Sequence, residues 1–212
     1  MSDIWNENTG VQVNPNDAIS FAGSGQIYNA DLFGGFNITA EKANSLFTFR
    51  RGDGSIDHSE MLTNLDEAGK IGSTMAFLVT HIGVRIVPLD SSTAITPAIA
   101  EAQKFLLGSA QIEVAYGSNK TKVGEFAGLH FLAPVDYVAA DATNTAAAAN
   151  AGAAGSSFIK LSKPIQIQKN LNISGTVRFG AAVPSSLLPV SPSDPALFGF
   201  VVDLFGVKKV DA

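Results

Sequence analysis

The sequence contains no cysteine, one tryptophan and few charged residues. The absence of cysteine excludes disulfides, zinc–thiolate sites and catalysis by a thiol. Charged residues make up 16% of the 212 residues, against ~25% in an average soluble domain. Hydrophobic residues make up 46%, so much of the surface must consist of uncharged side chains. The free-energy cost of removing water from such a surface is small, which favours extensive contact with other protein molecules.

The basic residues are scattered along the chain, and the net charge is −5. Proteins bind nucleic acid backbones through a basic patch or stripe, and because the sequence shows none we expect no direct contact with nucleic acid. The most apolar run, Met75–Leu89, contains His81 and Arg85 and is shorter than the ~20 residues of a membrane-spanning helix. Residues 1–10 lack the basic and apolar regions of a secretory signal. We therefore expect synthesis in the cytoplasm and no transmembrane segment.

The clearest pattern in the sequence is the alternation over Pro164–Phe179. Six of its eight odd-numbered positions from Ile165 onward are apolar, whereas every even-numbered position from Gln166 to Arg178 is polar. A period of two predicts β-structure with one buried and one exposed face. A single extended strand of this length would span ~50 Å, so we expect a bend or turn at Lys169-Asn170.

Further strands are predicted from short apolar segments bounded by glycine and proline. In Met75–Leu89 the alternation changes parity near Thr80-His81, which indicates a β-bulge there or a strand buried on both faces. The nearly continuous apolar run Leu197–Val207 predicts a central strand covered on both faces. The remaining strands are expected within residues 18–22, 26–36, 44–50, 110–116, 123–132 and 158–161.

Two short helices are predicted in the connections. Asp57 suits an N-cap and Glu60 falls three residues later, which is the spacing of a capping box. Gly69 or Gly72 can end this helix.

The second helix follows Thr96, an N-cap residue placed before a proline. We expect it to span Pro97–Leu107 and to stop at Gly108.

Because the predicted strands are not regularly interleaved with helices, a parallel sheet is disfavoured. We predict an all-β fold in which two antiparallel sheets form a sandwich. Eight strands arranged in two Greek keys form a jelly roll, so we predict a single jelly roll with two short helices in its connections. Residues 1–17 are polar and predict an N-terminal arm, followed by one jelly-roll domain over 18–212. Within it, residues 139–157 predict a long Ala/Gly-rich loop.

The tripeptide Arg51-Gly52-Asp53 matches a motif that some integrins recognise, but its surroundings are typical of a turn. We favour the turn. Asp53, Asp57 and Glu60 could gather round Ca²⁺, yet their spacing does not match an EF-hand loop. Helix capping accounts for the latter two without a metal.

No motif in the sequence supports catalysis. His58, His81 and His130 are far apart and form no ligand pair of the HExxH type. Asp57-His58-Ser59 is not a triad, because adjacent residues cannot line up as a relay. Gly23-Ser24-Gly25 lacks the third glycine of a dinucleotide fingerprint. We therefore assign no catalytic, cofactor-binding or metal-ligating residue, and we expect no enzyme activity.

Taken together, several features resemble the major capsid proteins of tail-less icosahedral viruses with upright jelly rolls, including internal-membrane bacteriophages. The shared features are the polar arm, the glycine-punctuated strands, the helix at Pro97–Leu107, the loop Ala139–Ser157, the segment Phe158–Ile165 and the hydrophobic C-terminal strand. At 212 residues only one jelly roll fits, whereas many of these proteins carry two. The resemblance implies a capsid subunit of the virion that assembles with copies of itself, and with other virion proteins, into trimers, pentamers or hexamer-like capsomers.

Two alternatives stay open. A β-sandwich binding module, such as a virion spike or a receptor- or carbohydrate-binding domain, would need an aromatic patch, and the sequence offers only Trp5 and three tyrosines for it, Tyr28, Tyr116 and Tyr137. A cupin-like enzyme would need about three His or Glu ligands inside its barrel, which the spacing of the histidines does not favour.

Overall fold

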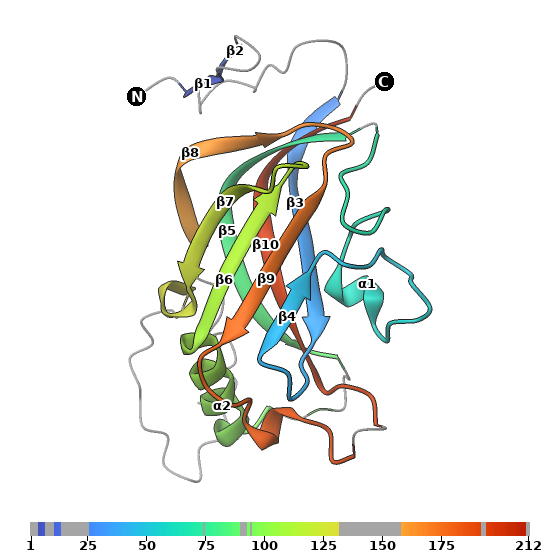
Figure 1. Ribbon diagram of the computed structural model, residues 1–212, viewed down its shortest axis with the longest axis vertical. Helices are drawn as coiled ribbons and strands as arrows, with labels where there is room; N and C mark the ends of the chain where they lie inside the picture. Colours follow the sequence, from blue (N-terminus) through green and yellow to red (C-terminus); the bar gives the residue numbers. More distant parts are fainter. Residues whose placement is uncertain are drawn as a thin grey trace.

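A computed structural model describes residues 4–6, 11–13, 26–73, 75–89, 93, 95–131, 158–191 and 194–210. Two four-stranded antiparallel sheets pack face to face, as the sequence predicts (Figure 1). The first sheet has the order β3-β10-β5-β8 and consists of β3 (Gln26–Asn37), β10 (Phe198–Val210), β5 (Met75–Pro88) and β8 (Phe158–Ile167). The second has the order β4-β9-β6-β7 and consists of β4 (Ala43–Leu46), β9 (Ile173–Phe179), β6 (Ala110–Tyr116) and β7 (Thr121–Ala127).

The strands pair in a nested order. In sequence, the first strand of the sandwich pairs with the last, β3 with β10, and the second with the second-last, β4 with β9. β5 then pairs with β8, and β6 with β7. These four pairs belong alternately to the first and the second sheet. The chain therefore resembles one long hairpin, closed by the turn at 117–120, that has been rolled up so that successive strand pairs face each other.

The alternating segment forms β8 and β9, and the predicted turn lies between them. Asn170 has a positive φ of 62°, a conformation that asparagine tolerates better than most residues. β9 then alternates strictly between buried odd-numbered and more exposed even-numbered positions. β8 also includes Phe158–Leu161, and it contains Pro164 in its interior. A proline is tolerated there because β8 is an edge strand.

The irregularity predicted in β5 is a β-bulge at Thr80. The register with β10 shifts opposite Phe205/Gly206, and the register with β8 shifts between Val79 and His81. The prediction of a central C-terminal strand is also confirmed, because β10 lies between β3 and β5.

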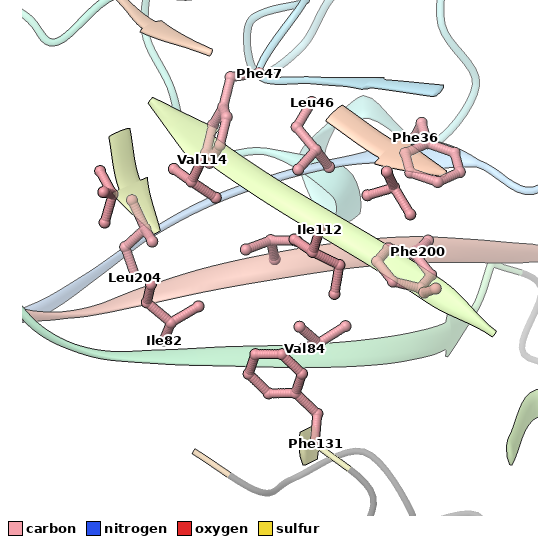
Figure 2. Packing of buried hydrophobic residues seen from close by; sticks show 14 of the residues in the cluster. Phe36, Leu46, Phe47, Ile82, Val84, Ile112, Val114, Phe131, Phe200 and Leu204 are labelled. Atoms are coloured by element: carbon pink, nitrogen blue, oxygen red, sulfur yellow. The ribbon is translucent and has the colours of Figure 1, made fainter. Parts of the chain in front are cut away.

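The core lies between the two sheets, where side chains from both point toward one another (Figure 2). The Phe36 and Phe200 rings stack at 5.4 Å, and the Phe179 ring meets Phe200 at 5.7 Å with an interplanar angle of 70°. Ile112 and Val114 of β6 are fully buried in the same cluster. Aromatic pairs in such offset and edge-on arrangements contribute ~0.5–1.5 kcal/mol each beyond the area they bury.

Helix α2 (Pro97–Gly108) has the predicted position and cap. The Thr96 side chain accepts a hydrogen bond from the backbone N–H of Ile99 at 3.3 Å. Gly108 is its last residue and Ser109 its C-cap, one residue later than predicted.

The capping prediction for the first helix is wrong. α1 is a single turn, Ser59–Leu62, with His58 in the N-cap position at a φ of 59° and no side-chain cap. The chain leaves the helix at Thr63 because Thr63 and the next residue are bound to β3. The Thr63 hydroxyl donates to the carbonyl of Phe33, and the N–H of Phe33 donates to the Asn64 side chain at 2.9 Å. These tertiary hydrogen bonds outweigh the local capping preference.

Other boundaries also differ from the predictions. β4 ends at Leu46, since Phe47 has a φ of 62° and its ring occupies the space that a side chain on Gly34 would need. The expected strand over 123–132 ends at Ala127 and continues as a short 3₁₀ helix, η1 (Gly128–Phe131). A second 3₁₀ helix, η2, spans Ser185–Leu187.

The region expected to be an arm contains a two-stranded ribbon. β1 (Ile4–Asn6) pairs with β2 (Val11–Val13) in antiparallel register. The expected strand at 18–22 and the expected loop at 139–157 lie outside the described residues.

Candidate functional site

The two outer faces of the sandwich differ in chemistry, and the more distinctive one is the outer side of the β3-β10-β5-β8 sheet. We call it the aromatic face, and we call the outer side of the β4-β9-β6-β7 sheet the polar face. On β10, Phe200, Val202 and Leu204 belong to the core between the sheets, so the alternate residues lie on the outer side. The aromatic face comprises Phe33, His81, Arg85, Phe158, Asp203 and Phe205.

An ion pair lies within the aromatic face. Arg85 donates from Nε to Asp203 Oδ2 at 2.9 Å and from Nη2 to Oδ1 at 3.1 Å. The Asp203 side chain is 5% exposed and the Arg85 side chain 40%, and the guanidinium lies over the Phe33 ring, 5.2 Å from its centroid. Burial raises the pKa of Asp203, and the hydrogen bonds and charge of Arg85 act in the opposite direction. Removal of Arg85 would leave the buried Asp203 carboxylate without an ion-pair partner, which would destabilise the fold.

Beside this ion pair, two phenylalanine rings meet over a glycine. The Phe158 and Phe205 rings are in edge-to-face contact, with centroids 4.7 Å apart and an interplanar angle of 83°. A Cβ atom on Gly83 would lie 2.9 Å from a ring atom of each. Gly83 therefore lets both rings lie close to the backbone of β5. Phe158 is nevertheless 55% exposed, which leaves an aromatic side chain accessible to a partner.

The β-bulge contributes polar groups to the same face. The Thr80 hydroxyl donates to the backbone carbonyl of Phe205 at 3.2 Å, next to the register shift between β5 and β10. His81 Nδ1 lies 2.9 Å from Thr80 Oγ1. Because the hydroxyl hydrogen is directed at the carbonyl, His81 Nδ1 is the donor in this second hydrogen bond.

One part of the first sheet's outer side is covered by the chain itself. The connection that contains α1 packs Phe49 and Leu62 against Val201 in a second hydrophobic cluster, with Phe33 at its border. Asn64 of this connection also binds the edge of β3, donating to the carbonyl of Asp31 at 3.0 Å. Bonding of this kind satisfies backbone groups that an edge strand would otherwise present to another chain. The cover does not include Phe158, His81 or Phe205 among its members.

The polar face carries hydrogen-bonded charged side chains in place of aromatic rings. Glu113 of β6 and Glu125 of β7 lie directly opposite each other, a repulsive arrangement for like charges. Lys122 binds both, at 3.2 Å to each, and these hydrogen bonds raise its pKa, that to Glu125 most. Gln111 donates to Glu125 at 2.8 Å. The charges thus bind one another, and the side chains are exposed to solvent.

The Arg51-Gly52-Asp53 tripeptide has the geometry of a turn. Gly52 has a φ of 71°, and the Asp53 side chain accepts hydrogen bonds from the backbone and the hydroxyl of Ser55, at 3.0 and 2.7 Å. These hydrogen bonds lower the pKa of Asp53, the one from the hydroxyl most. Arg51 pairs with Asp66 at 3.4 Å. The local contacts therefore account for this sequence as a structural element, as its composition predicts.

The three histidines lie on different elements. His58 precedes α1, His81 lies on β5 and His130 lies in η1. Within the described part of the chain, no group of three or more His, Asp or Glu side chains could hold a metal ion. No helix in the same ranges has the length and apolar character needed to cross a membrane.

The sequence did carry a signal for the ion pair, although our sequence analysis did not use it. Arg85 and Asp203 are 118 positions apart, and each is a lone charge of its sign in one of the two most apolar strands. Two opposite charges in strongly apolar strands are candidates for pairing, because burial of either alone is costly. What the sequence could not supply is the adjacency of β5 and β10.

Comparisons with known proteins add no assignment. No protein-family model matches the sequence, and neither does any curated protein.

Proposed function

We propose that this chain is a single-jelly-roll structural protein, a self-assembling subunit of an icosahedral virus capsid that has no enzyme activity. The nested pairing of eight strands, which alternates between two four-stranded sheets, supports the jelly roll, a fold common among viral capsid domains. The resemblance of the element order to capsid proteins supports the virion as its location.

The observation that carries the assembly proposal is the aromatic face. Phe158 is 55% exposed and rests on Phe205, and beside them lies an arginine that is stacked on Phe33 and paired with a buried aspartate. Aromatic residues and arginine are the residue types most enriched at protein–protein contacts that contribute strongly to affinity. Because the arginine is already oriented by Asp203 and Phe33, little conformational entropy is lost when a partner covers it. We propose that a neighbouring copy covers this face in the assembled capsid.

The polar face supports a different role. Its charged groups bind each other and face solvent, so their burial would carry a larger desolvation cost than covering the aromatic face, where Asp203 is already buried and Arg85 is partly buried. We expect this face to remain exposed, or to meet other subunits only at its margins.

The test is assembly of the purified full chain. We expect size-exclusion chromatography with light scattering to show capsomers, and negative-stain microscopy to show closed shells or regular arrays as the protein concentration is raised. A monodisperse monomer at ~100 µM, well above the Kd range of stable interfaces, would contradict the proposal. A monomer that binds glycans on an array would identify the binding-module alternative instead.

A further inference from the structure

One end of the sandwich carries an excess of lysine. Five segments meet there, because Gln26 at the start of β3 lies opposite Val210 at the end of β10, and Val210 also lies opposite Met75. The β6–β7 turn joins them through a 2.7 Å hydrogen bond from the N–H of Gly117 to the carbonyl of Asn172. We call this region, residues 26–30, 67–73, 116–121, 166–173 and 206–210, the lysine end.

The lysine end is strongly positive among the described residues, although the chain as a whole has a net charge of −5. Its single acidic residue is Glu67, which pairs with Lys70 at 3.1 Å. Its basic residues are Lys70, Lys120, Lys169, Lys208 and Lys209. Lys209 is buried, at 6% exposure, whereas Lys120 and Lys169 are exposed.

The opposite end is balanced. There α2, η2 and the adjoining strand ends and loops (residues 38–43, 97–112, 126–131, 178–191 and 194–200) contain three basic and three acidic residues in the described ranges. These six are Lys42, Lys104, Arg178, Glu41, Glu101 and Asp194. Charge is therefore separated along the sandwich, with the positive excess at the end where β3 begins.

The N-terminal segment, residues 1–25, has the opposite charge. It contains Asp3, Glu7 and Asp17 and no lysine, arginine or histidine. It is also joined to the lysine end covalently, because it leads into β3 at Gln26. Within it β1 lies beside β8, at the top of Figure 1 near the lysine end.

We infer that the lysine end is the docking surface for the acidic N-terminal segment, residues 1–25, of the same chain. The tether gives the segment an effective concentration in the millimolar range at this surface, so a weak attraction is sufficient. The β1–β2 ribbon has only three residues in each strand, and an isolated two-stranded ribbon of this size is marginally stable in water. Contact with the lysine end provides the additional stabilisation. This inference does not depend on the capsid proposal.

Docking of the segment can be measured by tryptophan fluorescence, because Trp5 lies in the segment and is the single tryptophan of the sequence. In the full chain at low salt, we expect Trp5 fluorescence to show the anisotropy of the whole molecule. The double variant Lys120→Glu/Lys169→Glu reverses two exposed charges of the lysine end. It should lower this anisotropy and raise acrylamide quenching by about twofold or more, because attraction between the segment and the end is replaced by repulsion.

The matched control is Lys42→Glu/Arg178→Glu, which makes the same change in net charge at two exposed positions of the opposite end. Its Trp5 signal should equal that of the wild type. Far-UV circular dichroism checks that both variants are folded. A measurement independent of any variant is a salt titration of the wild type, in which the Debye length falls from ~30 Å at 0.01 M to ~3 Å at 1 M and Trp5 should be released.

Three results would overturn the inference. One is equal Trp5 anisotropy in the wild type and in both double variants. Another is acrylamide quenching of Trp5 that, at concentrations where light scattering shows only monomer, is as strong in the wild type as in Lys120→Glu/Lys169→Glu; this would assign the segment to a neighbouring copy. The third concerns a single-stranded oligothymidine at low salt. If it binds the wild type without releasing the N-terminal segment, and does not bind Lys120→Glu/Lys169→Glu, the surface would be assigned to nucleic acid. If no oligothymidine binds, or if it releases Trp5 as it binds, the docking is supported.

Discussion

The aromatic face and the polar face are both formed by four antiparallel strands, yet their side chains differ in what they leave available to a partner. On the polar face, Lys122 bridges two glutamates that lie opposite each other. On the aromatic face, a single arginine binds a single buried aspartate, and exposed Phe158 lies beside them. The comparison shows that exposed charge in a network and half-buried charge among aromatic rings have different consequences. The first keeps a surface hydrated, and we propose that the second favours contact with a partner.

The largest effect is expected from Arg85→Met, which removes the partner of a carboxylate that is 5% exposed. We expect the free energy of unfolding to fall by ~2–4 kcal/mol, less than the full loss for a completely buried pair because Arg85 itself is partly exposed. Urea unfolding followed by circular dichroism measures this.

The control for Arg85→Met is Arg178→Met on the polar face, which is exposed and should change stability by less than ~0.5 kcal/mol. The double variant Arg85→Met/Asp203→Leu should recover most of the lost stability, because it leaves no unpaired charge. Equal losses for Arg85→Met and Arg178→Met would remove the distinction between the two faces.

The next largest effect concerns assembly. Phe158→Ser removes the exposed ring of the aromatic face, and we expect the concentration needed for assembly to rise by at least ~30-fold, as for the loss of a ~2 kcal/mol contact. Light scattering against protein concentration measures it. The matched control is Phe105→Ser on α2, because Phe105 is 56% exposed and Phe158 is 55% exposed. If both variants assemble at the same concentration, the aromatic face is not the contact that we propose.

A smaller effect is expected in the pH dependence of stability. The pKa of Asp203 is raised in the folded protein, so the folded state binds this proton more tightly than the unfolded state. Relative to Asp203→Asn, the wild type should therefore lose stability as pH rises through the window that begins near the ordinary pKa of 3.8. Urea unfolding of both proteins across this window tests the sign.

The comparison variant for this pH effect is Asp53→Asn, since hydrogen bonds from Ser55 lower the pKa of Asp53. Relative to this variant, the wild type should gain stability as pH rises toward 3.8 and keep that gain above it. If stability relative to the variant changes with pH in the same direction for Asp203 and Asp53, the assignment of a raised pKa to one and a lowered pKa to the other is contradicted.

The smallest effect is expected on the polar face. Lys122→Met leaves Glu113 and Glu125 opposite each other without the lysine between them, yet these side chains are exposed and screened by water. We expect a loss of stability much smaller than that for Arg85→Met, and we expect it to disappear in 1 M salt. A loss as large as that for Arg85→Met would mean that the polar face is as sensitive as the aromatic face.

Much of the fold was predictable because it rests on local patterns. The alternation in Pro164–Phe179 predicted two strands with a bend or turn between them, and Thr96 predicted the start of α2. The parity change near Thr80 predicted a bulge as one of two alternatives. The prediction failed at Asp57, where tertiary hydrogen bonds from Thr63 and its neighbour to β3 limit α1 to one turn. Local propensity decides such boundaries only where no distant segment competes.

The candidate site was not predictable in the same way. The sequence placed Arg85 and Asp203 in two apolar strands, but no local pattern indicates that β5 and β10 are neighbours. The lysine end is a further example, because its lysines come from four separate stretches of the chain and appear scattered in the sequence. For the same reason, the absence of a basic run was a weak guide to the charge of the surface.

The sequence by itself determined that this protein consists of antiparallel strands with one buried face, that it lacks thiol chemistry, and that its surface carries few charges. These properties follow from side-chain period and composition, which neighbouring residues fix. Only the tertiary structure decided which outer face presents Phe158 and Arg85, and which end collects the lysines. Strand order depends on contacts between residues far apart in the chain, and their free energy is set by the packing of the whole sandwich.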